Sequence, residues 1–361
     1  MRKIMRCCRL AGLLIVLLLA QSIVRVEAAG SAAAETRKPA PILARWRGLI
    51  GEYASEFDKL YVLESDGKLT ALIGGIEYDS LQEVSNEVFK FPRNGAYADE
   101  QAKFVRGSDG EASEIRIGDV TFKRQSPGPI EGGVFHVTPP KPVEALRQEA
   151  LAPEPPHEPG EFLKADLVDL STLDPSIRFD IRYASSHNFL STPVYSQPKA
   201  FLQRQAAEAL VRANRRLHSL GYGLLIHDAY RPWYVTKIFW DATPPDKKVF
   251  VADPSEGSRH NRGCAVDLTL YELATGKPVE MTGVYDEMSS RSYAYYPGGT
   301  SLERWQRNLL REAMESEGFQ VFEFEWWHFD YKDWRRYPIL NLTFDQLRQA
   351  GPGRPAVPQA Q

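Results

Sequence analysis

Short apolar runs separated by turn residues dominate the first third of the chain. Residues 60–63 and 69–73 lie on either side of an Asp66-Gly67 pair, a dipeptide typical of a tight β-hairpin turn. Four further short runs with turn residues between them follow, at residues 88–91, 104–105, 115–117 and 120–122. This pattern predicts a small all-β domain, a barrel or a sandwich, over residues 42–125.

Helical and strand periods mix in the second half of the chain. Apolar residues recur at helical spacing from Ala206 to Leu220 and from Trp305 to Ala313, and Gly221 and Gly318 follow as stops. Strand candidates, the last of them rich in aromatic residues, lie at residues 224–226, 264–270 and 319–328. The mixture predicts an α+β domain over residues 162–350, with helices packed on a mainly antiparallel sheet.

Proline separates these two regions. Residues 126–161 contain nine of the 25 prolines, which favours an extended, semi-rigid linker, and residues 143–151 form a candidate short helix within it. Residues 351–361, at the other end of the second region, are expected to form a disordered tail.

The N-terminus has the pattern of a secretory signal peptide over residues 1–28. A basic start precedes an apolar run from Leu10 to Val24, and Val26-Glu27-Ala28 offers a cleavage site with small residues at its ends. The alternative is an uncleaved membrane anchor, although the run is shorter than the roughly 20 residues that a membrane span needs. The pattern predicts export, to a periplasm or to the outside.

Loss of this segment changes the charge and the cysteine count. Residues 1–28 carry five basic residues and one acidic residue, so the formal net charge falls from −3 to −7 on cleavage. A protein this acidic has no electrostatic reason to bind nucleic acid. Cys7 and Cys8 leave with the signal peptide, so Cys264 remains alone and no intramolecular disulfide can form.

Two short motifs carry the candidate chemistry. S-R-H-N-R-G-C-A-V-D spans residues 258–267, and E-W-W-H spans residues 325–328. Together they supply two imidazoles and a carboxylate, the ligand types of catalytic zinc sites that keep one position open. These ligands would be His260, His328 and Asp267. Glu325 is then the candidate general base for the attacking water.

Each of these residues also has an ordinary structural interpretation. A lone loop histidine such as His260 is more often not a ligand, and E-x-x-H by itself fits a cross-strand Glu beside a core His. Asp267 is harder to explain in this way, because a carboxylate buried in an apolar strand needs a cation. Strand periodicity places Glu325 on the face opposite His328, so their convergence requires a bulge or a strand end.

The sequence allows two interpretations of Arg231. It lies in Asp228-Ala229-Tyr230-Arg231-Pro232, directly after a buried strand candidate. An arginine in a cleft can stabilise the oxyanion that forms as water attacks a carbonyl. The alternative is a structural ion pair between Arg231 and Asp228.

The motifs and their flanking runs resemble a known peptidase family. Together with G-Y-G-L-L-I-H-D-A-Y-R-P and A-V-D-L-T-L-Y, they are similar to the D-alanyl-D-alanine dipeptidases of the vancomycin-resistance type, over about residues 166–344. The resemblance implies an enzyme that holds one zinc ion per chain, with the ligands and the base already named and Arg231 as transition-state stabiliser. It also implies that Ser258, Tyr183 and Asp286 hold the free amino end of a dipeptide.

Two features depart from that family. The resistance-type enzymes typically lack a signal peptide and an N-terminal β domain, whereas this chain has the pattern of both. An exported enzyme of this kind would act on D-Ala-D-Ala or short peptidoglycan-derived peptides in cell-wall turnover. The β domain is then a candidate contact with the wall or with another protein.

Three alternatives remain open on the sequence. The chain could be a D,D-carboxypeptidase that trims longer stem peptides, which an open cleft without an amine pocket at Asp286 would favour. It could be a non-catalytic, metal-stabilised module that binds the wall, although a purely structural zinc site needs neither Glu325 nor Arg231. In the third alternative the β domain, as an anchor, carries the main biological role.

Overall fold

A computed structural model describes residues 37–350 of the chain. The architecture below belongs to the compact unit that begins at Ile42. The predicted signal peptide and the predicted C-terminal tail lie outside the described residues. Within residues 37–350 no helix is both long enough and apolar enough to cross a membrane.

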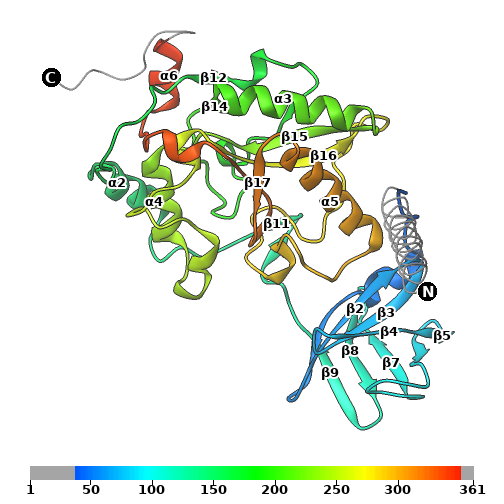
Figure 1. Ribbon diagram of the computed structural model, residues 1–361. Helices are drawn as coiled ribbons and strands as arrows, with labels where there is room; N and C mark the ends of the chain where they lie inside the picture. Colours follow the sequence, from blue (N-terminus) through cyan, green and yellow to red (C-terminus); the bar gives the residue numbers. More distant parts are fainter. Residues whose placement is uncertain (1–36, 351–361) are drawn as a thin grey trace, which may run out of the picture. The chain divides into compact units, whose positions relative to one another are not determined.

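The N-terminal part of this unit is a nearly closed antiparallel barrel (Figure 1). A short 3-10 helix, η1 (Ala44–Leu49), precedes a meander in which each strand pairs with its successor, except β4 with β5, and β9 pairs back with β1. The strands are β1 (Gly51–Ala54), β2 (Lys59–Ser65), β3 (Lys68–Ile73), β4 (Glu77–Ser80), β5 (Gln82–Ser85), β6 (Val88–Lys90), β7 (Gln101–Arg106), β8 (Ala112–Ile117) and β9 (Val120–Arg124). The predicted all-β region is confirmed.

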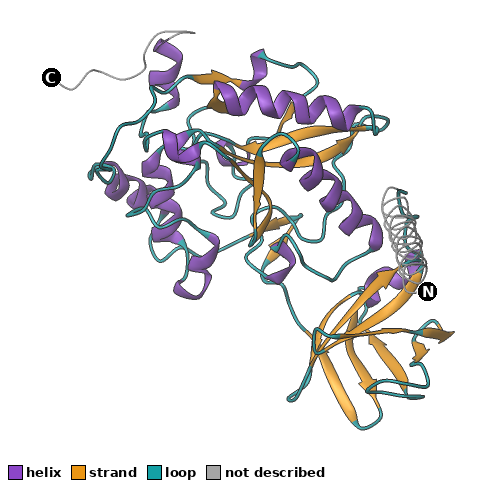
Figure 2. Ribbon diagram, viewed as in Figure 1, coloured by secondary structure: helices purple, strands orange, loops and turns teal. Residues whose placement is uncertain are grey.

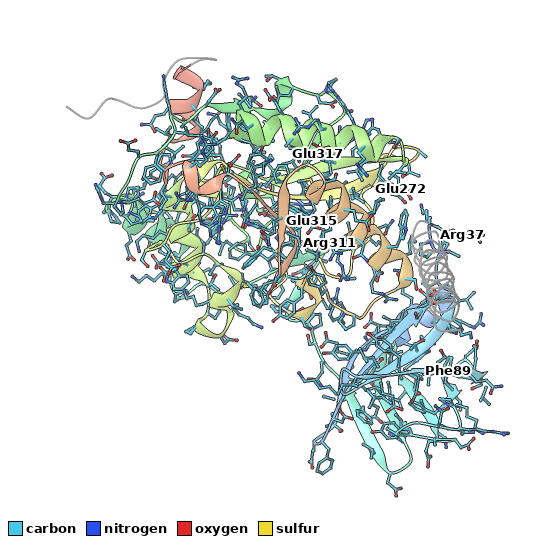
Figure 3. All side chains as sticks on the ribbon, viewed as in Figure 1. Arg37, Phe89, Glu272, Arg311, Glu315 and Glu317 are labelled. Carbon is cyan, nitrogen blue, oxygen red and sulfur yellow. The ribbon has the colours of Figure 1, made fainter. Side chains whose placement is uncertain are left out.

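Local turn chemistry and aromatic packing explain this barrel. Asp66 and Gly67 have φ values of 50° and 77°, the left-handed conformation that a two-residue hairpin turn requires. Inside the barrel Phe89, labelled in Figure 3, is fully buried, and its ring centroid lies 5.5 Å from that of Phe104 and 6.4 Å from that of Trp46. The barrel thus has an apolar core of its own.

The proline-rich segment is partly folded. It contains a hairpin of β10 (Ile130–Glu131) and β11 (Val134–Phe135), followed by α2 (Val143–Leu151), which has the predicted bounds. Val143, Leu146 and Ala150 are buried in the core of the C-terminal region. The segment is therefore not only a spacer, although its prolines suggest one. The apolar residues of α2 are spaced to lie on one helix face, and this face packs into the C-terminal core.

The C-terminal region is an α+β structure, as predicted (Figure 2). Its main sheet has the order β13-β15-β16-β18-β17, and β13 with β15 is the parallel pair. These strands are β13 (Arg178–Phe179), β15 (Tyr222–Asp228), β16 (Ala265–Glu272), β17 (Phe319–Phe322) and β18 (Glu325–Tyr331). A two-stranded sheet pairs β12 (Leu167–Asp169) with β14 (Phe201–Gln203).

Four α-helices accompany these sheets: α3 (Arg204–His218), α4 (Trp233–Ala242), α5 (Ser301–Glu315) and α6 (Phe344–Ala350). Gly221 and Gly318 follow α3 and α5 with φ values of 85° and 88°, so both predicted stops are confirmed. Thr300 and Glu303 form a reciprocal capping box at the start of α5. Short 3-10 helices are η2 (Leu170–Thr172), η3 (Arg182–Ala184), η4 (Pro245–Phe250), η5 (His260–Arg262), η6 (Ser290–Ser292) and η7 (Trp334–Arg336).

The single aromatic strand predicted over residues 319–328 is wrong. The structure has a hairpin there, with β17 and β18 separated by Glu323 and Phe324. The E-W-W-H motif consequently begins a strand instead of ending one. The prediction failed because Phe322 and Phe324 carry the aromatic pattern through the turn without a Gly or Pro to mark it.

Candidate metal centre and active site

Three neighbouring strands place acidic and histidine side chains in one row. Asp228, at the end of β15, lies opposite Asp267 of β16, and Asp267 in turn lies opposite His328 of β18. Cross-strand partners lie close enough for their side chains to interact. The register of the sheet thereby brings together two of the three predicted metal ligands.

A tight turn supplies the third ligand. His260 begins η5, and Gly263 ends that helix in the left-handed conformation, with a φ of 66°. A Cβ atom at this position would lie 2.3 Å from Cδ2 of Leu167, so a larger residue would force the Leu167 side chain to shift. Asn261 ties the turn to the segment after β15 by donating its side-chain amide to the carbonyl oxygen of Arg231 at 2.8 Å.

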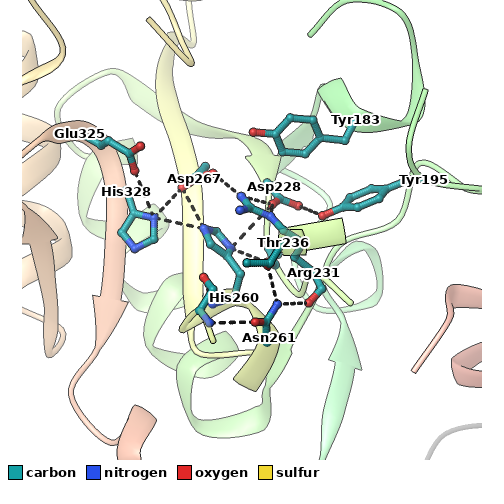
Figure 4. A network of polar contacts seen from close by, with 12 residues as sticks. Tyr183, Tyr195, Asp228, Arg231, Thr236, His260, Asn261, Asp267, Glu325 and His328 are labelled. Carbon is teal, nitrogen blue, oxygen red and sulfur yellow. Dashed lines mark hydrogen bonds and ion pairs between the residues drawn. The ribbon is translucent and has the colours of Figure 1, made fainter. Parts of the chain in front are cut away.

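The three predicted ligand atoms converge (Figure 4). His260 Nε2 lies 3.1 Å from His328 Nδ1 and 3.3 Å from Asp267 Oδ1, and His328 Nδ1 lies 3.1 Å from Asp267 Oδ1. A tetrahedral zinc ion with bonds of 2.0–2.1 Å separates its ligand atoms by roughly 3.3 Å. The triangle therefore has the size of one face of such a tetrahedron, which leaves the fourth position open.

The surroundings of these atoms also fit a cation. Asp267 is 2 % exposed, and its Oδ1 has no hydrogen-bond partner among the described residues. His260 Nδ1 lies 2.6 Å from the carbonyl oxygen of Ala229, and His328 Nε2 lies 2.9 Å from a carboxylate oxygen of Asp330. Donation of these N–H groups leaves the lone pairs of both facing nitrogens free for a metal.

Glu325 lies beside the triangle. Its Oε2 is 3.7 Å from His328 Nδ1, and the register shift between Val321 and Phe322 provides the irregularity that this approach requires. Burial raises the pKa of Glu325 to about 8, and the Asp267 carboxylate adds to the shift while His328 opposes it. A buried carboxylate with a raised pKa is suited to take and return a proton near neutral pH.

Arg231 forms an ion pair and also lines the cleft. Its Nε and one terminal nitrogen lie 3.0 and 2.9 Å from Asp228 Oδ2, which is the ion pair considered above. The same side chain lines the cleft and lies 3.5 Å from Asp267 Oδ2. Tyr195 donates to the other oxygen of Asp228 at 2.7 Å, so the carboxylate that orients the guanidinium is itself held.

The residues predicted for the amine end lie in the same cleft. Tyr183 donates to Oδ1 of Asp286 at 2.9 Å, and Oδ2 of Asp286 is buried without a partner among the described residues. Ser258 Oγ accepts from the backbone N–H of His260 at 3.2 Å. All eight predicted site residues line this one cleft, which has a volume of about 100 Å³.

Two further residues at the centre were missed from the sequence. Asp330 contacts His328, and the Tyr285 hydroxyl donates to Asp267 Oδ2 at 3.0 Å. Asp330 could have been found, because residues two apart on a strand share a face. Tyr285 carried no such signal, since its neighbour Asp286 was the residue that matched the family pattern.

Comparison with known proteins covers the C-terminal half of the chain. Residues 163–346 match the M15 peptidase family, described as D-ala-D-ala dipeptidase. The D-alanyl-D-alanine dipeptidase of Escherichia coli K12 is 35 % identical over 179 residues, which are 50 % of this chain and 91 % of that protein. The dipeptidase of Enterococcus faecalis V583 is 37 % identical over 189 residues, 46 % of this chain and 92 % of that protein.

A relative from Streptomyces coelicolor, also named D-alanyl-D-alanine dipeptidase, is 33 % identical and matches over 47 % of this chain and 94 % of its own length. Among solved structures, the LdcB LD-carboxypeptidase is similar over 48 % of this chain and 71 % of that chain, with 18 % identity and a TM-score of 0.28. The family match and the relatives agree with one another. The chain therefore belongs to the M15 family of D-Ala-D-Ala dipeptidases and is a hydrolase of the metallopeptidase type.

Proposed function

We propose that this enzyme uses zinc to hydrolyse D-Ala-D-Ala or similar short D-amino-acid peptides derived from the cell wall. The observation that carries the proposal is the triangle of His260, Asp267 and His328 with Glu325 beside it. Relatives named D-alanyl-D-alanine dipeptidase support the substrate class. Two imidazoles and one carboxylate favour zinc over harder cations such as Mg²⁺ or Ca²⁺.

The proposed chemistry divides between the ion and the protein. A zinc ion at this site would polarise the scissile carbonyl and lower the pKa of the attacking water. Glu325 accepts the proton of that water and passes it to the leaving amine. Arg231, oriented by Asp228, directs a guanidinium edge to the oxygen on which negative charge develops.

The other end of the cleft supports a preference for short substrates. Asp286 Oδ2 is buried and unpaired among the described residues, so a substrate ammonium group would supply the missing partner. Tyr183 holds the opposite oxygen of the same carboxylate. A cleft of about 100 Å³ that ends in a carboxylate favours a dipeptide with a free amino end over a long peptide.

A D,D-carboxypeptidase that acts on longer stem peptides is the alternative reaction. The two reactions are separated by comparing D-Ala-D-Ala with its N-acetylated form. The proposal predicts cleavage of the free dipeptide and no cleavage of the blocked one, because an acetyl group removes the charge that Asp286 would bind. Cleavage of both at similar rates would assign the enzyme to the carboxypeptidases.

A non-catalytic wall-binding module is the second alternative. Such a module would bind zinc and peptide without turnover. Glu325 and Arg231 both line the cleft, although a structural metal site needs neither of them, and this favours the enzyme.

We further propose the domain organisation and export that the sequence indicates. Residues 1–28 would be removed as a signal peptide. Residues 42–125 would form a contact with the wall or with another protein. Residues 126–161 would connect this β domain to the peptidase domain at residues 162–350. N-terminal sequencing of the protein recovered from outside the cytoplasm tests the first point, since a start near residue 29 is expected. A recovered protein that still begins at Met1 would favour the membrane anchor.

A further inference from the structure

The hydroxyl of Tyr285 lies between the metal centre and the amine pocket. It is 3.0 Å from Oδ2 of Asp267 on one side and 3.1 Å from the hydroxyl of Tyr183 on the other. Tyr183 in turn donates to Asp286 at 2.9 Å. A continuous buried chain of polar contacts therefore joins a candidate metal ligand to the carboxylate that faces the substrate amine.

The surrounding rings fix the position of this hydroxyl. Tyr285 is 8 % exposed, and its ring centroid lies 4.7 Å from that of His227 and 5.5 Å from that of Trp327. A side chain packed in this way has little freedom to move its hydroxyl. The contact with Asp267 is therefore set by the fold of the cleft.

The backbone places the Asp286 side chain in the cleft and the Tyr285 hydroxyl against Asp267, although the two residues are adjacent in sequence. Successive side chains of an extended chain point to opposite sides. Here Asp286 has a φ of 62°, within a turn closed by the Glu287 N–H and the Val284 carbonyl oxygen at 3.2 Å. The left-handed conformation is strained for a residue other than glycine. Here it occurs at the position that directs the side chains of Tyr285 and Asp286.

We propose that Tyr285 is a positioning residue that orients Asp267 toward the metal and couples the metal centre to the amine pocket. The part that concerns the substrate ammonium rests on the proposed function. The hydroxyl contacts Oδ2 at 3.0 Å, where the Arg231 guanidinium lies at 3.5 Å, and Oδ1 of Asp267 is left as the oxygen that faces the two histidines. Metal ligands are commonly oriented by outer hydrogen-bond partners of this kind.

The count of protons explains the coupling. The two phenols have one proton each, but three contacts join Asp267, Tyr285, Tyr183 and Asp286. A proton on the Asp286 carboxyl would complete the chain, and burial raises the pKa of that carboxyl well above its usual range. An ammonium group that pairs with ionised Asp286 keeps Tyr183 donating to that carboxylate, so the single Tyr285 proton is then shared between Tyr183 and Asp267.

The test measures zinc affinity of the full mature chain without any substrate, by competition with a chromophoric chelator. Tyr285→Phe removes only the hydroxyl and should weaken zinc binding by about 10- to 100-fold. Tyr183→Phe, which leaves the Asp267 contact in place, should have a smaller effect. Tyr295→Phe is the matched control because Tyr295 is 64 % exposed, and it should leave the affinity unchanged.

The coupling is tested by adding Asp286→Asn to the wild-type and Tyr285→Phe backgrounds. Asp286→Asn should change zinc affinity severalfold in the wild-type background and clearly less in Tyr285→Phe, a non-additivity typical of residues in one network. Far-ultraviolet circular dichroism of each variant establishes that it is folded. An affinity of folded Tyr285→Phe within twofold of wild type would overturn the positioning role, and equal effects of Asp286→Asn in both backgrounds would overturn the coupling.

These measurements separate the inference from the proposed function. If zinc binds and Tyr285→Phe weakens it while no dipeptide is cleaved, the substrate assignment fails and the positioning role stands. If the wild-type chain binds no zinc, both fail.

Discussion

At the scale of single residues, Asp330 holds the histidine that comes from β18. It accepts from His328 Nε2 at 2.9 Å, and this contact leaves Nδ1 for the metal. Asp330→Ala should therefore weaken zinc binding by about 10- to 100-fold. Asp330→Asn should have an intermediate effect, because its amide oxygen still accepts a hydrogen bond.

Asp333→Ala provides the matched control in the same zinc competition assay. Asp333 follows β18 and lies 4.0 Å from Arg336 in a half-exposed ion pair. Wild-type affinity is expected for this variant. Equal zinc affinity of Asp330→Ala and Asp333→Ala would show that His328 does not depend on its carboxylate partner.

Glu325 makes the metal-free protein sensitive to pH. Its pKa is raised by burial to about 8 from an ordinary value of 4.5, so the folded state binds the proton more tightly than the unfolded state. The stabilisation is then full below about pH 4.5 and is lost as the pH rises toward 8. The charged groups that act on Glu325 are His328, Asp267, Arg231 and Asp330.

Glu325→Gln should therefore gain stability relative to the wild type as the pH rises from 5 to 8. The expected gain in the free energy of unfolding is of the order of 1–3 kcal/mol. Urea unfolding in the presence of a chelator measures it at both pH values. A stability difference that stays constant between pH 5 and pH 8 would contradict the raised pKa.

At the scale of elements, the turn at Gly263 links stability to the metal centre. Gly263→Ala places a methyl group against Leu167 in a left-handed conformation, and we expect a loss of about 1–3 kcal/mol. The same change should weaken zinc binding, because this turn positions His260.

Gly276 offers a matched control for this substitution. It has a similar φ of 69°, follows the far end of β16, and its added Cβ would meet only the flexible end of Arg178. Gly276→Ala should lower the unfolding temperature without changing zinc affinity. If both variants bind zinc like the wild type, the turn at Gly263 is not what positions His260.

Elements with clear stops were predictable from the sequence. The Asp66-Gly67 turn and the helix ends before Gly221 and Gly318 follow from local backbone chemistry, which needs no tertiary information. The hairpin of β17 and β18 could not be predicted from the sequence, because its turn contains no Gly or Pro. The burial of α2 in the C-terminal core depends on packing between distant segments, which periodicity does not report.

The candidate site was likewise predictable from the sequence in part. Six of the eight predicted residues that line the cleft lie in motifs whose residue types have few other uses together, whereas Tyr183 and Asp286 followed only from the family resemblance. Convergence of Glu325 and His328 needed a bulge, and the structure has a register shift between Val321 and Phe322. Tyr285 could not be found, since its role depends on a turn conformation at Asp286 and on three rings that pack around it.

At the scale of the whole molecule, the barrel and the α+β region have separate apolar cores. All of the candidate site residues lie in the α+β region, and its core also includes residues of β11 and α2. A chain that begins at residue 126 should therefore fold and cleave D-Ala-D-Ala with a KM within about threefold of that of the full mature chain. Steady-state kinetics of the two chains, with circular dichroism as the folding control, tests this independence. Loss of cleavage in a folded shorter chain would give the barrel a part in catalysis.

The most direct measurement is amine release from D-Ala-D-Ala by the metal-stripped chain of residues 29–361 as zinc is added back. We expect no release without metal, and release that rises until one zinc ion is bound per chain. Glu325→Gln should bind the same single ion without restoring release. Undiminished cleavage by the metal-stripped chain, or no cleavage once zinc is bound, would contradict the proposed zinc-dependent hydrolysis.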